Sequence, residues 1–134
     1  AEFLIQKSAV ATDAQEIFQR MVFNVLLGNT DDHSRNHAVI YHLTERYWCL
    51  SPAYDVLPIN NSRLHGLGIG AKGREGSVEN LLSHASRFGL KEFKAKQHIN
   101  TIKELLAEWP QYFRKYGVGE GDIERLRGVI PVVN

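Results

Sequence analysis

The chain has 134 residues, 43% hydrophobic and 23% charged, with a formal net charge of +1, which suits one soluble domain or part of one. No apolar run approaches the ~20 residues of a membrane-spanning helix, and the single cysteine, Cys49, excludes an internal disulfide and a multi-cysteine zinc site. We therefore expect a cytoplasmic protein that neither enters membranes nor binds nucleic acid directly.

The sequence begins at Ala1, without an initiator methionine, and shows no signal peptide. We expect residues 1–134 to form one domain that is a fragment of a larger protein. Residues 1–60 carry four basic and seven acidic side chains, whereas residues 61–134 carry twelve and eight. The basic half could face phosphates or an acidic partner, although dispersed charges usually mark solvated helix faces.

The first predicted helix covers residues 13–27, where apolar residues recur at helical spacing. Residues 1–11 show no such pattern, and we expect no regular structure there. Thr12 and Gln15 fit a capping box at the start of the helix. Gly28 stands where a helix prefers glycine at its end.

A β-hairpin is predicted next, from the β-prone runs 37–42 and 47–50 around a polar turn at 44–46. The hairpin should bring Asp55, which follows the second run, back toward the polar loop after the first helix. Pro52 and Pro58 stiffen the backbone on both sides of Asp55.

The second half of the chain should be mostly helical. Residues 60–76 are rich in Gly, Asn and Ser and predict a long loop, with one short strand at 67–69. Ser77 is a good N-cap for a helix that Gly89 stops.

Three further helices follow in the prediction. An amphipathic helix over 93–109 precedes a short helix with Pro110 at its first position, and a last helix over 123–130 is closed by Pro131. The predicted fold class is mainly α, with one small hairpin beside the polar loop.

Asp31 and Asn36 have the spacing D-x-x-x-x-N in that loop. Protein kinases use this spacing for a catalytic aspartate and a metal-binding asparagine. Asp32 is one residue too close to Asn36, so we interpret it as a polar neighbour. The alternative is an ordinary turn, because Asn and Asp favour turns and the spacing is common by chance.

Asp55 adds the second acid that phosphoryl transfer requires. Magnesium binds through one or two carboxylates together with phosphate oxygens. Asn36 and Asp55 are therefore candidate Mg²⁺ ligands and would bind ATP through the metal. Asp31 is the candidate catalytic base. A turn-capping role remains the alternative for Asp55.

Two further patterns carry less weight. His33 lies within reach of Asp31 or of phosphate oxygens, but it could equally stabilise the loop. His33 and His37 are four residues apart but do not share a helix, which disfavours a zinc pair.

Residues 68–73 match G-x-G-x-x-G but lack the strand–turn–helix context of a dinucleotide site. A flexible loop is therefore favoured. Lys72 could still approach a phosphate from this loop.

The stretches FNVLLGNTDDHSRNH (23–37) and LSPAYDVLP (50–58) resemble the C-terminal lobe of HipA-type serine/threonine kinases, the toxins of bacterial toxin–antitoxin systems. The resemblance implies that Asp31 is the catalytic aspartate, that Asn36 and Asp55 bind magnesium, and that the lobe is mainly helical and lies under an ATP site. It implies a protein hydroxyl as substrate and a DNA-binding antitoxin as partner.

The resemblance is incomplete in two respects. The ATP-binding lysine and the phosphate-covering loop of the family lie in an N-terminal lobe that these residues do not supply, so we expect the isolated chain to be inactive. Arg35 stands where some members carry lysine, which keeps the charge but changes the geometry. The alternatives are a non-catalytic lobe that docks an antitoxin or another domain, and a metal-dependent hydrolase that uses Asp31, Asp32, His33 and Asp55.

Overall fold

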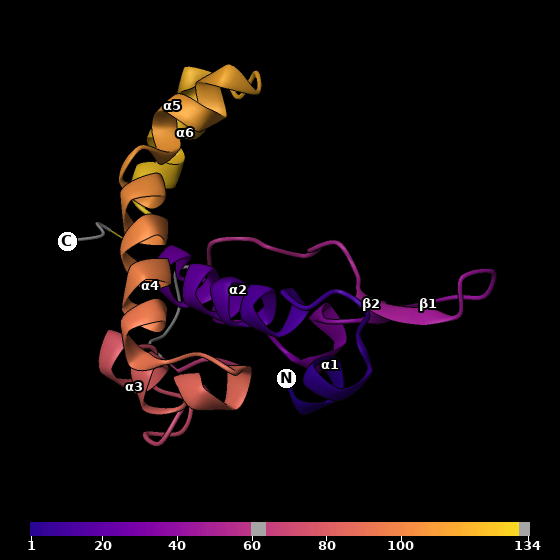
Figure 1. The fold of residues 1–134 in the computed structure, drawn as a ribbon. Helices are drawn as coiled ribbons and strands as arrows, with labels where there is room; N and C mark the ends of the chain where they lie inside the picture. The colour runs from indigo at the N-terminus through magenta and orange to yellow at the C-terminus, as the bar shows by residue number, and fades with distance from the viewer. Residues whose placement is uncertain (60–63, 132–134) are drawn as a thin grey trace.

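The computed structural model describes residues 1–59 and 64–131 and confirms a mainly α fold with one hairpin (Figure 1). The N-terminal half contains α1 (Glu2–Lys7), α2 (Asp13–Leu27), the 3₁₀ turn η1 (Ser34–Asn36), β1 (Val39–His42) and β2 (Tyr47–Leu50). The C-terminal half contains α3 (Val78–Ser83), η2 (Ala85–Phe88), α4 (Glu92–Ala107), α5 (Trp109–Lys115) and α6 (Glu120–Arg127). No helix among the described residues is long and apolar enough to span a membrane.

Helix α2 has the predicted bounds, but the predicted capping box is wrong. Thr12 has helical dihedral angles and makes no side-chain cap. The Asp13 carboxylate is instead buried, and it accepts hydrogen bonds from the Leu50 amide at 2.7 Å and from the Ser8 hydroxyl at 2.5 Å. Gly28 ends the helix in the left-handed conformation, at φ 81°, as predicted.

Helix α1 contradicts the expectation of no regular structure over residues 1–11. Its Leu4 is buried against Ala14 of α2 and Leu50 of β2. Six residues are too few for a stable isolated helix, so tertiary packing decides the conformation of this segment. The contact of Phe3 with Trp48, with ring centroids 5.5 Å apart, adds to that packing.

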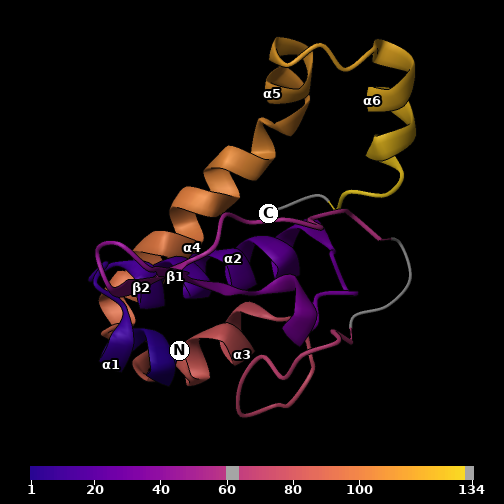
Figure 2. The ribbon, with the colours of Figure 1, turned by 90° about the vertical axis from the view of Figure 1, so that its right-hand side faces the viewer.

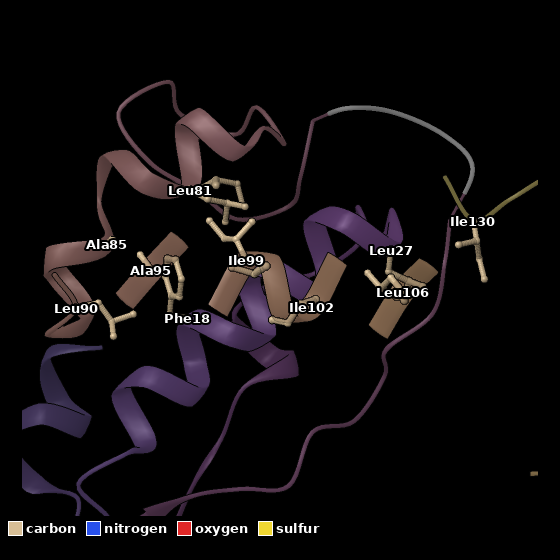
Figure 3. Packing of buried hydrophobic residues seen from close by; sticks show 12 residues of the cluster. Phe18, Leu27, Leu81, Ala85, Leu90, Ala95, Ile99, Ile102, Leu106 and Ile130 are labelled. Atoms are coloured by element: carbon tan, nitrogen blue, oxygen red, sulfur yellow. The ribbon is translucent and has the colours of Figure 1, made fainter. Parts of the chain in front are cut away.

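The main core lies where α2 crosses α4 (Figure 1). Phe18 of α2 is fully buried and lies beside Ala95 and Ile99 of α4, while Leu81 of α3 closes the core from another side (Figure 3). Fully burying a side chain of this size contributes roughly 1.5–3 kcal/mol. The loop after α2 therefore starts from a rigid element.

Strands β1 and β2 pair antiparallel from Val39–Leu50 to His42–Tyr47, which confirms the hairpin. The first strand begins at Val39 rather than at residue 37, because His37 belongs to the polar loop. The hairpin projects from the helical body (Figure 1). Its return strand leads into residues 51–59, which run back along the loop.

The segment before α3 differs from its prediction. The strand expected at 67–69 is absent; residues 64–75 instead form a loop with isolated bridges from Leu64 to Glu75 and from Gly70 to Gly73. Residues 60–63 of the predicted loop lie outside the described residues. Ser77 caps α3 as predicted, accepting from the Asn80 amide, but the predicted helix is split at His84 into α3 and η2.

The C-terminal helices form an arm that leaves the body and returns to it (Figure 2). Pro110 is the second residue of α5 rather than the first, and α6 ends at Arg127, before the predicted stop at Pro131. Ile130 follows α6 and is buried in the main core with Leu27 and Leu106.

Candidate active site

Residues 51–59 are held along the loop after α2 by contacts at three places. The Ile59 amide donates to the Gly28 carbonyl at 3.0 Å, and the Tyr54 hydroxyl donates to the Arg35 carbonyl at 2.6 Å. Between them, the Asn29 side-chain amide donates to the Asp55 carbonyl at 3.4 Å. The hairpin therefore returns the chain to the loop, as the sequence predicts.

Asn36 and Asp55, the two candidate metal ligands, lie in direct contact. The Asn36 Nδ2 donates to the Asp55 Oδ2 at 2.8 Å, across 19 residues of sequence. Because a carboxylate only accepts, the amide nitrogen must face Asp55. The Asn36 Oδ1 is then buried without a hydrogen-bond partner among the described residues, while the Asp55 side chain is exposed.

Asp55 has a left-handed backbone, with φ of 56°. Only a few per cent of residues other than glycine have positive φ, and such strain persists where the surroundings impose it. Here the Asn29 amide binds the Asp55 carbonyl while Asn36 binds its carboxylate. Asn29 is itself buried and also bonded to Asn24 at 3.1 Å.

The adjacent acids Asp31 and Asp32 differ in burial. Asp31, the candidate base, is exposed at the start of the loop, and no described residue forms a hydrogen bond or ion pair with its carboxylate. Asp32 is only 3% exposed, and its Oδ1 lies 2.8 Å from the Nε2 of His37. The sequence interpretation of Asp32 as a polar neighbour missed this buried pair.

His33 is half-buried, and its Nδ1 is buried without a partner among the described residues. A zinc pair with His37 gains no support, because the His37 Nε2 faces Asp32. In the described part of the chain, no group of three or more His, Cys, Asp or Glu side chains is arranged to hold a metal. Asp32, which the hydrolase hypothesis uses together with Asp31, is buried against His37.

A second loop, residues 64–75, packs against the loop that carries Asp31 and Asn36. The Gly66 amide donates to the Thr30 carbonyl at 2.9 Å, and a Cβ at Gly66 would lie 2.5 Å from the Asp32 carbonyl oxygen. Burial lowers the pKa of His65, against the opposing effects of the Asn29 backbone and the Asp32 carboxylate. Sequence periodicity gave no signal for His65 or Gly66, because both lie in an irregular loop.

The glycine pattern at residues 68–73 has a structural explanation. Its Ala71 and Lys72 amides donate to Ser83 Oγ and Asn80 Oδ1, both at 2.8 Å. A Cβ at Gly70 would lie 2.0 Å from the Asn80 carbonyl oxygen, so only glycine fits there. These two amides are therefore engaged within the protein and do not form a phosphate cradle.

A family model described as HipA-like C-terminal domain matches residues 1–109. The chain belongs to this family. No curated protein and no solved structure gave a significant match. The HipA-like family is kinase-related and associated with toxin–antitoxin systems, in agreement with the resemblance found in the sequence.

The HipA-like match contains the whole candidate site. It extends from α1 to the first residue of α5 and includes Asp31, Asn36 and Asp55. The C-terminal arm after Trp109 lies outside the match. The roles of Asp31, His33, Asn36 and Asp55 remain predictions.

Proposed function

We propose that this domain is the catalytic C-terminal lobe of a HipA-like kinase that transfers the γ-phosphoryl group of ATP to a serine or threonine hydroxyl of a protein. The observation that carries the proposal is the 2.8 Å contact between Asn36 and Asp55. It joins the D-x-x-x-x-N loop to the separate acid that this chemistry requires. A second, nucleotide-binding lobe would supply the lysine and the loop over the phosphates.

The donor set fits magnesium. An exposed carboxylate lies beside an amide whose oxygen is buried without a partner among the described residues. Magnesium prefers oxygen ligands of this kind and commonly takes only one or two from carboxylates. Asn36 and Asp55 would hold the ion, with the Asn36 amide turned so that Oδ1 rather than Nδ2 faces it. The bound ion would neutralise charge on the β- and γ-phosphates.

The remaining residues act on the hydroxyl and the phosphates. Asp31 orients the substrate hydroxyl and takes its proton as the oxygen bonds to the γ-phosphorus, while the bond to the β–γ bridging oxygen breaks and ADP is the leaving group. An exposed carboxylate that no described residue binds suits this role. His33 is proposed to contact phosphate oxygens or to orient Asp31, because its buried Nδ1 has no partner among the described residues.

The roles are tested by separating metal binding from chemistry. In the kinase that contains both lobes, Asp31→Asn should abolish phosphorylation but leave Mn²⁺ binding intact, whereas Asp55→Asn should abolish both. Mn²⁺, used in place of Mg²⁺, is followed by paramagnetic broadening of the Asn36 and Asp55 NMR signals, and phosphorylation by transfer of labelled phosphate.

Asp122→Asn is the matched control, because it removes an exposed carboxylate from α6, far along the chain from the site. It should change neither readout. Retained phosphorylation in Asp31→Asn or Asp55→Asn would overturn the proposal.

A non-catalytic lobe that docks an antitoxin is the second candidate function. It is favoured by an apolar cavity of about 310 Å³ between α2, α4 and α5, lined in part by Phe23, Leu105 and Trp109. Docking there would need neither Mg²⁺ nor ATP. Two results together would support docking over catalysis. The wild-type protein with both lobes would show no phosphorylation, and partner binding would persist in Asp55→Asn.

A further inference from the structure

Asp32 is the second residue of the Asp31–Asn36 loop, and His37 directly follows its last residue. Their side chains meet across it, with 2.8 Å between the Asp32 Oδ1 and the His37 Nε2. The Asp32 side chain is 4% exposed and that of His37 is 21% exposed. Hydrogen bonds to a charged group in such surroundings are shorter and stronger than those between neutral groups.

This contact ties the two ends of the loop together. Between them the backbone turns through η1, in which the Asn36 amide donates to the His33 carbonyl at 2.9 Å. Asp31 precedes Asp32, and Asn36 precedes His37, so a fixed distance between the pair restricts where both functional side chains lie. Without it, the Tyr54 bond to the Arg35 carbonyl and the single bond from Asn36 to Asp55 would be left to hold Asn36 in place.

We infer that Asp32 and His37 are positioning residues, forming a brace that holds Asn36 in place to bind metal beside Asp55. Neither residue touches substrate or metal in this role. The inference rests on the proposed function and deepens it, because it explains why the second of two adjacent acids is buried while the first is exposed.

The second loop gives the brace independent support. Gly66 lies directly against the Asp32 backbone, where a Cβ would be 2.5 Å from the carbonyl oxygen. His65 is 2% exposed and lies close enough to interact electrostatically with Asp32. Asp32 is therefore fixed through its backbone by one loop and through its side chain by His37.

His37 offers a pair of variants that separates the hydrogen bond from packing. His37→Phe keeps a ring but removes the donor to Asp32. His37→Gln places an amide N–H near the position of Nε2 and should restore the contact. His98→Phe is the matched control, because the His98 Nδ1 bonds Gln19 at 2.7 Å between α4 and α2, away from the loop.

Two measurements are made on the 134-residue chain. Without metal, hydrogen exchange of the Asn36 amide should be faster in His37→Phe than in the wild type, His37→Gln or His98→Phe. With Mn²⁺, titrated by the broadening of the Asn36 and Asp55 signals, His37→Phe should bind about 10-fold more weakly, as expected when a metal ligand loses its supporting contact. His37→Gln should recover most of that loss.

The outcomes distinguish this inference from the proposed function. Equal exchange and equal Mn²⁺ binding in all variants would overturn the brace, and so would faster exchange with unchanged Mn²⁺ binding. Equal losses in His37→Phe and His37→Gln would also overturn it, since packing would then be the cause. If the wild type bound no Mn²⁺ at Asn36 and Asp55, the proposed metal site would fail and the positioning role would fail with it, whereas the exchange data would still show whether the contact orders the loop.

Discussion

Asp31 and Asp32 are adjacent in the chain, yet the structure exposes one carboxylate and buries the other. Burial of a carboxylate is costly unless it is hydrogen-bonded or paired, and Asp32 meets this requirement through His37. The neighbouring Asp31 is exposed, as its proposed role toward a substrate hydroxyl requires. Two residues of the same type are therefore distinguished by their side-chain partners.

Gly66 tests how closely the second loop supports Asp32. In Gly66→Ala, the new Cβ would meet the Asp32 carbonyl oxygen at 2.5 Å, which forces the backbone to shift. We expect a loss of about 1–3 kcal/mol in the free energy of unfolding, together with weaker Mn²⁺ binding. Urea unfolding and the NMR titration measure the two effects.

Gly68 is the matched control for that substitution. No heavy atom lies within 4 Å of the position of its Cβ, and its φ is not positive. Gly68→Ala should change the free energy of unfolding by less than about 0.5 kcal/mol. A similar loss in both variants would show that Gly66 has no special contact with the site.

Helices α2 and α4 form the support from which the loop departs. Phe18 of α2 is fully buried in their interface, and its ring centroid lies 5.4 Å from that of Phe88. The two apolar faces explain why both helices were predictable from sequence periodicity. Their packing holds the end of α2 at Gly28, three residues before Asp31.

Phe18→Ala should lower the free energy of unfolding by about 3–5 kcal/mol, because it leaves a cavity in this interface. Phe93→Ala is the matched control, since Phe93 lies in the first turn of α4 and is 68% exposed. It should cost less than about 0.5 kcal/mol. Urea unfolding followed by tryptophan fluorescence measures both, and equal losses would contradict the assignment of the core.

At the scale of the whole molecule, the C-terminal arm packs against the domain that the family model matches. The HipA-like match ends at residue 109, but Ile130 returns from the arm to the main core beside Leu27 and Leu106. Residues beyond the match thus share a core with the helix that precedes the site. The arm is therefore part of the same folded unit.

Stability should depend on pH through two histidines in different parts of the molecule. Burial lowers the pKa of His65 in the second loop and of His98 in α4, where Lys94 adds to the effect. The unfolded chain then binds more protons than the folded one once the pH falls below the unfolded value of about 6.5. The free energy of unfolding should therefore decrease as pH falls from 7.5 to 5.5.

Urea unfolding at pH 7.5 and 5.5 measures this decrease. His65→Gln and His98→Gln should each reduce the difference between the two pH values, because each removes one of the titrating groups. A difference that is unchanged in both variants would show that other groups cause the pH dependence.

The sequence alone determined the mainly helical class, the hairpin, the ends of α2 and the candidates Asp31, Asn36 and Asp55. These features depend on local patterns: helical periodicity, β-prone runs around a turn, and a fixed spacing in a polar loop. Family membership supports the same stretch. Each of these signals is contained within a short part of the chain.

Only the tertiary structure decided the roles of α1, Asp32, His65 and Gly66. Helix α1 forms because Leu4 finds Ala14 and Leu50, and Asp32 is buried because His37 bonds its side chain and a loop more than thirty residues away covers its backbone. The left-handed backbone of Asp55 likewise depends on Asn29 and Asn36. Such contacts join distant segments, so no local pattern encodes them, and they arise only when the chain is packed.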